Sequence, residues 1–439
     1  MLRVTRVYAK KISQAKQKEF FPGKLSYLNI KKFEGEHTYS NAKNTWTLMQ
    51  EARALTSMPA MYLFVTAVKY FAYASLPMFV DTTAFTGAVV VLCVCIGRWA
   101  ARGKQNTVVK DLSGKTVLIT GASRGIGLQT AIQLSQMGAN IHVVTRSGAH
   151  VEAAMEKIRS VAQDRSTQEF TLTTVDFADL VAVRDFTRVM LKKNQKIDIL
   201  VNNAGVLREH YHATRFGEDE MLVVNLLSPY LLTEGLLPLM QKSTGRIVNI
   251  TAAAHSSVTS DAVRKYLEGR GTWSEKKVGH KYDSLEQYGF TKLCMIFHTQ
   301  QLAVRSYPKL PKTEAQSRQQ RAAIARGEIV LDPTTQMPNF VVCCANPGGV
   351  LSNLYRDSKV TSSVFHYLYY PFLLLMRSPH EGSQTVVNCC VRDDIVNGGC
   401  YVNCHYKPDF LSRAACDVKE RTTVMEWVHK KLQPYMKWE

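Results

Sequence analysis

Tyr288 and Lys292 are spaced to form an acid–base pair. They lie four positions apart in the stretch YGFTK, so on a helix both side chains face the same way, one turn apart. An ammonium close to a phenol favours the phenolate and lowers the pKa of the phenol. Such a tyrosine can act as a general acid or base when an alcohol and a carbonyl are interconverted. The pair alone occurs often by chance, so its meaning depends on the segments that position it.

A glycine-rich turn gives a second chemical signal. An apolar run leads into TGASRGIG at 120–127, and a helix is expected at 128–137. Gly121 permits the turn, while Gly125 and Gly127 allow close approach of a pyrophosphate and of the helix to the strand. The helix N-terminus offers N–H groups and positive dipole to phosphate. A strand, a glycine turn and a helix in this order predict a dinucleotide site.

The elements that would carry both signals alternate between short apolar runs and helix-length amphipathic segments. The runs are KTVLIT, ANIHVVT, FTLTTV, IDILVN, RIVNIT and NFVVCCA. Apolar strands joined by crossover helices predict an α/β fold, a Rossmann-type doubly wound parallel sheet flanked by helices. Two polar segments near 260–283 and 308–337 interrupt this rhythm. We interpret them as insertions that contribute no core element.

Several motifs together carry a family resemblance. TGASRGIG, Asp176, NNAG (202–205), YGFTK and NPGG (346–349) stand in the order found in the short-chain dehydrogenase/reductase family. KYDSLEQYGFTKL (281–293), SP-x-EG-x-QT (378–385) and GG-x-YVNC (398–404) resemble its retinol dehydrogenase and WW-domain oxidoreductase branch. The resemblance covers about 110–435, which we expect to be the NADP(H)-binding domain, and leaves 1–109 unexplained.

The resemblance implies a set of site residues. Tyr288 would be the acid/base, Lys292 its partner, and Asn225 the support of a proton relay through water to the lysine. Asp176 would bond adenine, and Ser352 would contact the carboxamide. The ribose side would be lined by Asn202, Ala204 and Gly205. The expected cofactor-binding residues are Gly121, Ser123, Arg124, Gly125, Ile126, Gly127, Arg146, Asp176, Asn203, Ala204, Gly205, Tyr288, Lys292, Pro347, Gly348 and Ser352.

One member of the expected set is missing. Relatives place a serine just after the strand RIVNI to donate a hydrogen bond to the substrate oxygen, and this chain has Ala252 there. Alternate strand residues point to opposite faces, so Thr251 should look away from the site unless the strand bulges. Ser256 or Ser257 folding back is the other alternative. Losing one such donor typically costs ~10²–10³ in rate.

Charge near the second strand predicts the cofactor type. NAD-binding relatives hold the ribose 2′-hydroxyl with an acidic residue at the end of this strand, whereas a basic residue accommodates a 2′-phosphate. The strand ends in Thr145-Arg146, with Arg124 in the glycine turn and no acid nearby. The sequence therefore predicts NADP(H) over NAD(H).

The N-terminal region predicts membrane attachment. Residues 1–59 are basic, with Glu19 as the first acid, and suit either a targeting peptide or a basic cytosolic tail. The stretches 60–80 and 82–97 are apolar and close to the ~20 residues that cross a bilayer. Basic residues flank both outer ends, which favours a helical hairpin over 60–98. A single span at 82–98 is the alternative, and either the endoplasmic reticulum or mitochondria would fit.

The overall charge and the cysteines narrow the partners. The net charge is +19, which fits nucleic acid, anionic lipid or a phosphorylated small molecule. The basic residues are scattered and no nucleic-acid motif is present, so we expect no nucleic-acid partner. The ten cysteines form no disulfide pattern, and the Cys400-x-x-x-Cys404-His405 stretch lacks a second ligand pair, so we expect free thiols and no metal.

Two functions follow. The first is a membrane-anchored NADP(H)-dependent oxidoreductase acting on a lipophilic alcohol or carbonyl, of retinoid, steroid or lipid type. VFHYLYYPFLLLM (364–376), where relatives cover the substrate, suits an apolar ligand, although a packed helix would look the same. The second is a nucleotide-binding scaffold or membrane-complex subunit that has lost turnover because of Ala252. Relatives pair through the helices that hold Asn225 and Tyr288, so a homodimer is also expected.

Overall fold

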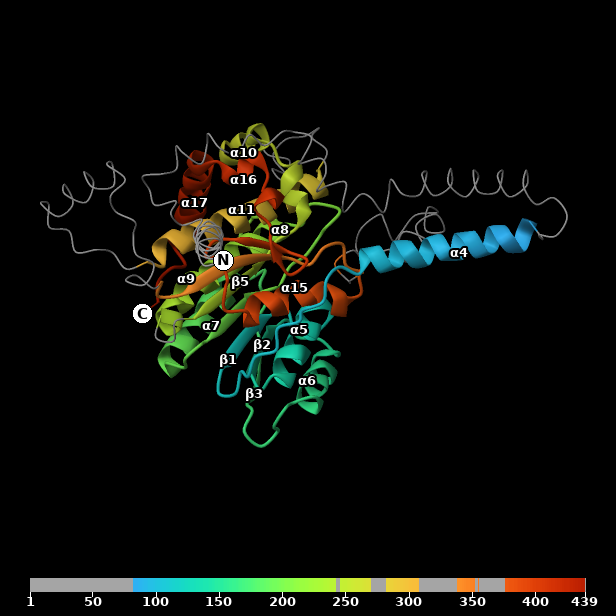
Figure 1. Ribbon diagram of the computed structural model, residues 1–439. Helices are drawn as coiled ribbons and strands as arrows, with labels where there is room; N and C mark the ends of the chain where they lie inside the picture. The colour runs from blue at the N-terminus through green and yellow to red at the C-terminus, as the bar shows by residue number, and fades with distance from the viewer. Residues whose placement is uncertain are drawn as a thin grey trace, which may run out of the picture.

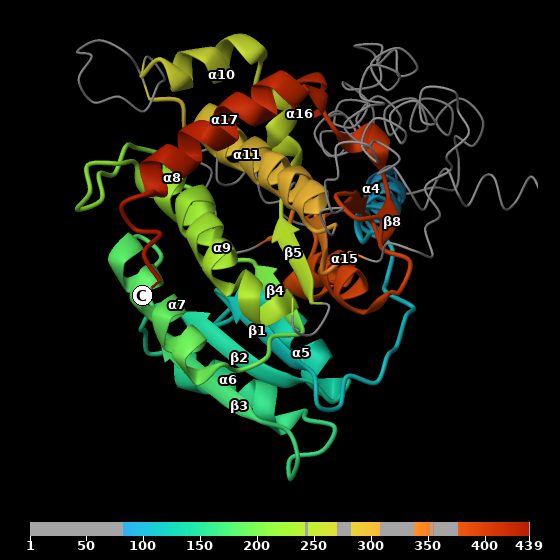
Figure 2. The same cartoon turned by 90° about the vertical axis from the view of Figure 1, so that its left-hand side faces the viewer.

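A parallel sheet lies between two layers of helices in the computed structural model, which describes residues 82–241, 245–269, 282–307, 338–351, 354 and 376–438 (Figures 1 and 2). Among these residues eight strands form one sheet in the order β3-β2-β1-β4-β5-β6-β7-β8. Every neighbouring pair is parallel except β7 and β8. The prediction of a Rossmann-type doubly wound fold is confirmed.

The first six strands fall on the six predicted runs, and β7 and β8 are too short for the pattern to reveal them. Their bounds are β1 Thr116–Thr120, β2 Asn140–Thr145, β3 Phe170–Thr174, β4 Ile199–Asn202, β5 Arg246–Ile250, β6 Val341–Asn346, β7 Cys400–Val402 and β8 His405–Tyr406. The chain order reverses between β1 and β4, and ligands of doubly wound sheets bind at such a switch point, outside the carboxyl ends of the strands.

Alternation along each strand explains why the sheet is covered on both faces. On β1, Leu118 joins the core under one helical layer, while Val117 and Ile119 join the other. The first layer holds α7 Leu180–Lys193, α8 Glu220–Leu222, α9 Ser228–Gln241 and α11 Ser284–Arg305. The second holds α5 Gly125–Gln136, α6 Val151–Ser160 and α15 Pro379–Val391. The period of two therefore sends apolar side chains into two separate cores.

An outer group of helices packs over α11 (Figure 2). It comprises α10 Ser260–Leu267, α16 Arg413–Cys416 and α17 Val418–Leu432. Tyr266 of α10 is buried and stacks on Phe290, with ring centroids 4.0 Å apart. The interpretation that 260–283 adds nothing to the core is thus wrong for its first eight residues. The apolar spacing of Ala262, Val263 and Tyr266 along one face was the overlooked signal. The segment 308–337 lies outside the described residues.

Helix α4, Thr82–Ala101, projects from the domain as a single rod (Figure 1). Several of its large apolar side chains are exposed: Val91 is 62%, Leu92 59%, Ile96 56% and Trp99 74% exposed. Its apolar part, Gly87–Ala101, is shorter than a full span. In the described part of the chain the helical stretch long and apolar enough for that is Glu220–Met240, and 89% of its apolar 18-residue window is buried in the domain. The predicted apolar segment at 60–80 lies outside the described residues.

Candidate active site

The site is built where α11 crosses the end of β5. At Gly289 a Cβ atom would stand 2.5 Å from the carbonyl oxygen of Ala254, closer than any real contact. Only a glycine lets the helix approach the 3-10 turn Ala253–Ser257 so closely. The neighbouring Tyr288 is half-buried beside this turn. The contact therefore fixes the phenol next to the corner where substrate is expected.

Lys292 lies one turn further along α11 and is buried. Its Nζ donates to the carbonyl oxygen of Ile250 at 3.1 Å and stands 5.4 Å from the centroid of the Tyr288 ring. Burial lowers the pKa of the Lys292 ammonium to about 8. The predicted acid–base pair is thus brought together, with its amine held at the end of β5.

Asn225 lies on a π-helical turn, η2 Val223–Leu227, between α8 and α9. Its amide oxygen accepts from the Val206 N–H at 2.8 Å, and its Nδ2 donates to the Val206 carbonyl at 2.9 Å and to Thr291 Oγ1 at 3.3 Å. Thr291 in turn donates to the Tyr288 carbonyl at 2.8 Å. Asn225 is therefore linked to α11 between the two catalytic candidates. Sequence reasoning missed Thr291, although it lies inside YGFTK.

Asp219 makes a second connection between these elements. It is 1% exposed, and its carboxylate accepts from the Leu222 N–H at 3.1 Å, from Gln287 Nε2 at 3.2 Å and from the Tyr282 hydroxyl at 2.9 Å. Burial raises the pKa of Asp219. The side chain caps α8 and holds the residue before Tyr288. Its only sequence signal was its place at a helix start.

The carboxyl ends of β1 and β4 form a tight edge. The Thr120 hydroxyl accepts from the N–H groups of Asn203 and Ala204, each at 3.0 Å. A Cβ at Gly127 would stand 2.4 Å from Asn203 Nδ2, and one at Gly121, whose φ is +68°, would stand 2.9 Å from the Ala204 Cα. Both glycines are thus required by the packing of the edge itself.

Asn202 differs from its expected place. It is buried, and its Nδ2 donates to Thr233 Oγ1 at 2.9 Å and to Asn249 Oδ1 at 2.8 Å, inside the domain. Asn203, one residue later, donates instead to the carbonyls of Thr120 and Gly121 at 2.9 and 3.1 Å. Because neighbouring strand residues point to opposite faces, only Asn203 lies at the glycine turn, and Asn202 does not line the ribose side.

The end of β2 meets the glycine turn. Thr145 Oγ1 donates to Ser123 Oγ at 3.2 Å, and His150 Nε2 lies 3.3 Å from the same hydroxyl. Arg146 is exposed beside them. Arg124 occupies the N-cap of α5 without a side-chain capping bond, so the cap is not what satisfies the first N–H groups of the helix. His150 is a neighbour of the turn that sequence reasoning missed.

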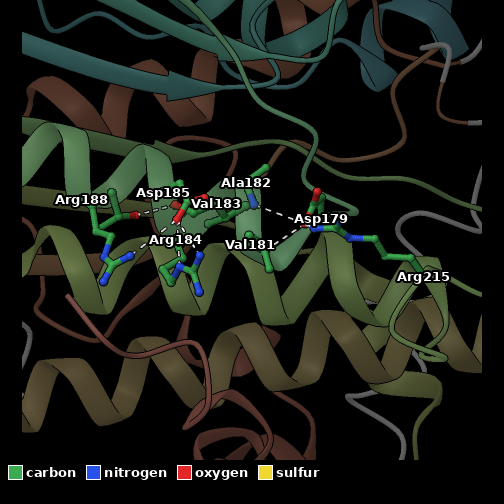
Figure 3. A network of polar contacts seen from close by, with 9 residues as sticks. Asp179, Val181, Ala182, Val183, Arg184, Asp185, Arg188 and Arg215 are labelled. Carbon is green, nitrogen blue, oxygen red and sulfur yellow. Dashed lines mark hydrogen bonds and ion pairs between the residues drawn. The ribbon is translucent and has the colours of Figure 1, made fainter. Parts of the chain in front are cut away.

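Asp176 follows β3 and is exposed, accepting the Ala178 N–H at 2.9 Å. The next acid, Asp179, caps α7 by accepting the N–H groups of Val181 and Ala182 at 2.9 and 3.2 Å. Asp179 also forms an ion pair with Arg215 (Figure 3). The turn that carries Asp176 is thus tied to the segment between β4 and α8.

The NPGG segment follows β6. Gly348 has φ +79°, and its N–H donates to Asn346 Oδ1 at 3.0 Å, while the Pro347 carbonyl accepts from Arg377 Nη1 at 2.8 Å. Arg377 was not anticipated from the sequence. Ser352, the expected contact of the carboxamide, lies outside the described residues.

The position of the missing hydroxyl is occupied by a methyl group. Thr251 is buried and donates to the Lys292 carbonyl at 3.3 Å, so its hydroxyl faces the backbone of α11, as strand alternation predicts. Ser257 donates to the Ala254 carbonyl at 2.7 Å, and Ser256 Oγ lies 3.5 Å from His255 Nε2. Both serines bond within their own 3-10 turn. Thr251 and Ala252 are the two residues between β5 and that turn, and Ala252 has no hydroxyl to offer.

Comparisons with known proteins identify this arrangement. The profile described as short chain dehydrogenase matches residues 115–266. Mouse retinol dehydrogenase 12 (Mus musculus) is 28% identical over 314 residues, 71% of this chain and 84% of that protein. Human retinol dehydrogenase 11 (Homo sapiens) is 28% identical over 302 residues, 68% and 80% of the two chains. The chain is thus similar to short-chain dehydrogenases/reductases, and to retinol dehydrogenases among them.

A solved structure agrees on the fold. An uncharacterised protein of Mycobacterium paratuberculosis superposes with a TM-score of 0.51 at 22% identity, over 75% of this chain and 98% of that one. The family is one of oxidoreductases, and its fold binds a nicotinamide nucleotide.

The residues present fit such a nucleotide. Gly121 and Gly127 let the glycine turn pack closely on the segment after β4, and the N-terminus of α5, which has no side-chain cap, opens directly behind the turn. At Gly205 a Cβ would stand 3.3 Å from Asn225 Oδ1 and 3.8 Å from Lys292 Nζ. A Cβ there would press on the Asn225 amide oxygen and reach the Lys292 amine, so this glycine brings the backbone after β4 close to both side chains, where a nicotinamide ribose is expected.

Burial of the Lys292 amine makes stability depend on pH. Between its folded pKa of about 8 and its ordinary value of 10.5, the folded protein binds fewer protons than the unfolded chain, so stability rises with pH. From pH 7.5 to 10, we expect the free energy of unfolding of the nucleotide-free protein to gain about 2 kcal/mol relative to Lys292→Met. Denaturant unfolding at several pH values measures this. The exposed Lys157→Met control should follow the wild type, and parallel curves for wild type and Lys292→Met would contradict the expectation.

Proposed function

We propose that this protein is a membrane-anchored, NADP(H)-dependent oxidoreductase that interconverts a lipophilic alcohol and carbonyl. The observation that carries the proposal is the joint position of Tyr288, Lys292 and Asn225 around the end of β5. The resemblance to retinol dehydrogenases supports a substrate of retinoid, steroid or lipid type.

The proton chemistry follows from these residues. When bound, a nicotinamide nucleotide supplies the hydride for a carbonyl carbon or takes it from an alcohol. Tyr288 gives its phenolic proton to the substrate oxygen, or removes it in the reverse direction. The Lys292 ammonium, 5.4 Å from the ring centroid, favours the phenolate and so eases that transfer. Asn225, held on both sides by Val206, keeps the π-helical turn against α11.

Ala252 sets the rate of this chemistry. A methyl group cannot donate a hydrogen bond to the substrate oxygen as charge develops there. Thr251 is committed to the Lys292 carbonyl, so the phenol of Tyr288 is left to provide the stabilisation. This same observation favours the second candidate function, a nucleotide-binding scaffold or membrane-complex subunit without turnover.

Turnover of Ala252→Ser separates the two functions. With NADPH and an apolar aldehyde such as a retinoid, we expect slow reduction by the wild type and a gain of ~10²–10³ in kcat for Ala252→Ser. Tyr288→Phe should remove activity in both backgrounds, and Ser257→Ala, whose hydroxyl is exposed, should leave it unchanged. If the wild type binds NADPH without turnover, and turnover appears only in the Ala252→Ser variant, the native protein is a scaffold. Activity that survives Tyr288→Phe would sink the mechanism.

The cofactor preference rests on Arg146 and its surroundings. Arg146 and the Thr145–Ser123–His150 contact lie together at the end of β2, where a 2′-phosphate is expected. A charge-assisted hydrogen bond is worth about 1.5–3 kcal/mol. We therefore expect NADPH to bind at least about tenfold more tightly than NADH, and Arg146→Ala to remove most of that ratio. Fluorescence titration with each nucleotide measures the two affinities. Arg165→Ala, in the segment before β3 and away from the carboxyl end of β2, is the control. Equal affinities in the wild type would refute the preference.

Membrane attachment rests on the exposed apolar side of α4. Its Cys95 is exposed in the structure, as is Val109, 83% exposed on the segment before β1. If α4 lies in the bilayer, a charged maleimide should label the Val109→Cys variant at its introduced thiol in membrane vesicles and leave Cys95 unmodified. Peptide mass spectrometry after quenching reads out both sites in one protein. Labelling of Cys95 as fast as that of the introduced thiol would place α4 in water.

A further inference from the structure

The end of α4 and the NPGG segment share one side chain, Arg377. Its Nε donates to the Ala101 carbonyl at 3.0 Å and its Nη1 to the Pro347 carbonyl at 2.8 Å. Its Nη2 donates to Asn403 Oδ1, in the turn between β7 and β8. One planar guanidinium thus joins the last turn of the apolar helix to the loop after β6 and to the sheet edge.

Two glycines form a seat for this guanidinium. Gly103 has φ +72° and Gly348 φ +79°. A Cβ at Gly103 would stand 2.6 Å from Arg377 Nη2, and one at Gly348 would stand 2.5 Å from Nη1. Both glycines adopt a left-handed backbone, which favours glycine, and a Cβ at either position would push the guanidinium out of its place. One glycine belongs to the segment after α4 and the other to the nucleotide pocket.

The backbone of Arg377 is tied to the same loop. Its N–H donates to the Gly349 carbonyl at 2.9 Å, and its carbonyl accepts from the Leu351 N–H at 2.8 Å. These bonds make a parallel bridge between Val350 and Arg377. Main chain and side chain therefore hold the loop together, so a shift of the side chain is transmitted to the loop.

A second contact seats α4 on α15 (Figure 2). Arg98 Nη2 bonds both carboxylate oxygens of Glu381, at 2.8 and 2.6 Å. Glu381 also closes a capping box with Ser378 at the start of α15. At Gly382 a Cβ would stand 2.4 Å from Val350 Cγ2 and 3.4 Å from Ile126 Cγ1. The start of α15, which Arg98 of α4 contacts, thus lies against both the loop after β6 and the glycine turn.

We propose that Arg377 is a positioning residue through which the C-terminal end of α4 holds the loop of the nucleotide pocket in place. The apolar helix then stabilises the site in addition to attaching the domain to a membrane. This inference rests on the proposed function for its nucleotide. It requires that a change at Gly103, outside the catalytic domain, alters the loop 346–351 and its nucleotide affinity, and that this effect passes through Arg377.

Glycine substitutions in the full chain test the proposal. Gly103→Ala forces a Cβ against the guanidinium, whereas Gly114→Ala has the same φ of +72° and no atom within 4 Å. Hydrogen–deuterium exchange of the nucleotide-free protein should speed up over 346–351 for Gly103→Ala and Arg377→Gln, and stay at the wild-type rate for Gly114→Ala. The Kd for NADPH should rise about tenfold for the first two variants, as expected for a lost charge-assisted bond.

A double-mutant cycle shows whether Arg377 carries the effect. In the Arg377→Gln background, Gly103→Ala should add no further change in exchange or in Kd. Full additivity, or equal effects of Gly103→Ala and Gly114→Ala, would overturn the proposal. If exchange over 346–351 changes as expected but the wild type binds no NADPH, Arg377 is still shown to position the loop, and the proposed function is refuted. Arg305→Gln, which breaks an ion pair with Glu234 on another face, is the matched arginine control.

Discussion

The close approach of α11 to the end of β5 is the constraint on which the site depends. Gly289 lets the helix backbone lie against the Ala254 carbonyl, and three consequences follow from that one contact. Tyr288 stands beside the 3-10 turn that follows β5, the Lys292 amine reaches the Ile250 carbonyl, and the Thr251 hydroxyl points to the helix. The π-helical turn with Asn225 is then locked onto α11 through Thr291.

This arrangement buries a positively charged side chain. Lys292 lies in a place where desolvation disfavours its charge, and its pKa falls to about 8. The proposed proton transfer uses that charge beside the phenol, whereas the free energy of unfolding would be higher without it. Sites of this kind are where local rules are broken for chemistry. Ala252 fits the same picture, since it removes a polar group from the corner and leaves the folding contacts of α11 untouched.

The nucleotide edge depends on a different principle, in which backbone groups and glycines take the place of charged side chains. Thr120 accepts two backbone N–H groups from the segment after β4, and the glycines there are demanded by the protein's own packing. Arg377 extends this edge toward α4. The nucleotide pocket is therefore supported by the sheet on one side and, through Arg377, by the end of α4 on the other.

The sequence by itself determined the layout. The six main strands, the doubly wound sheet, the glycine turn and the Tyr288–Lys292 pair all follow from local periodicity and short motifs, because each depends on neighbours in the chain. Even the direction of Thr251 follows from strand alternation.

Only the tertiary structure decided which side chains close the site. Thr291 and Asp219 join segments about 66–68 residues apart, and Arg377 meets Ala101 from a distance of 276 residues. The packing of α10 on Phe290 and the inward turn of Asn202 were settled in the same way. Such contacts depend on how elements remote in sequence are brought together, and no local pattern encodes that.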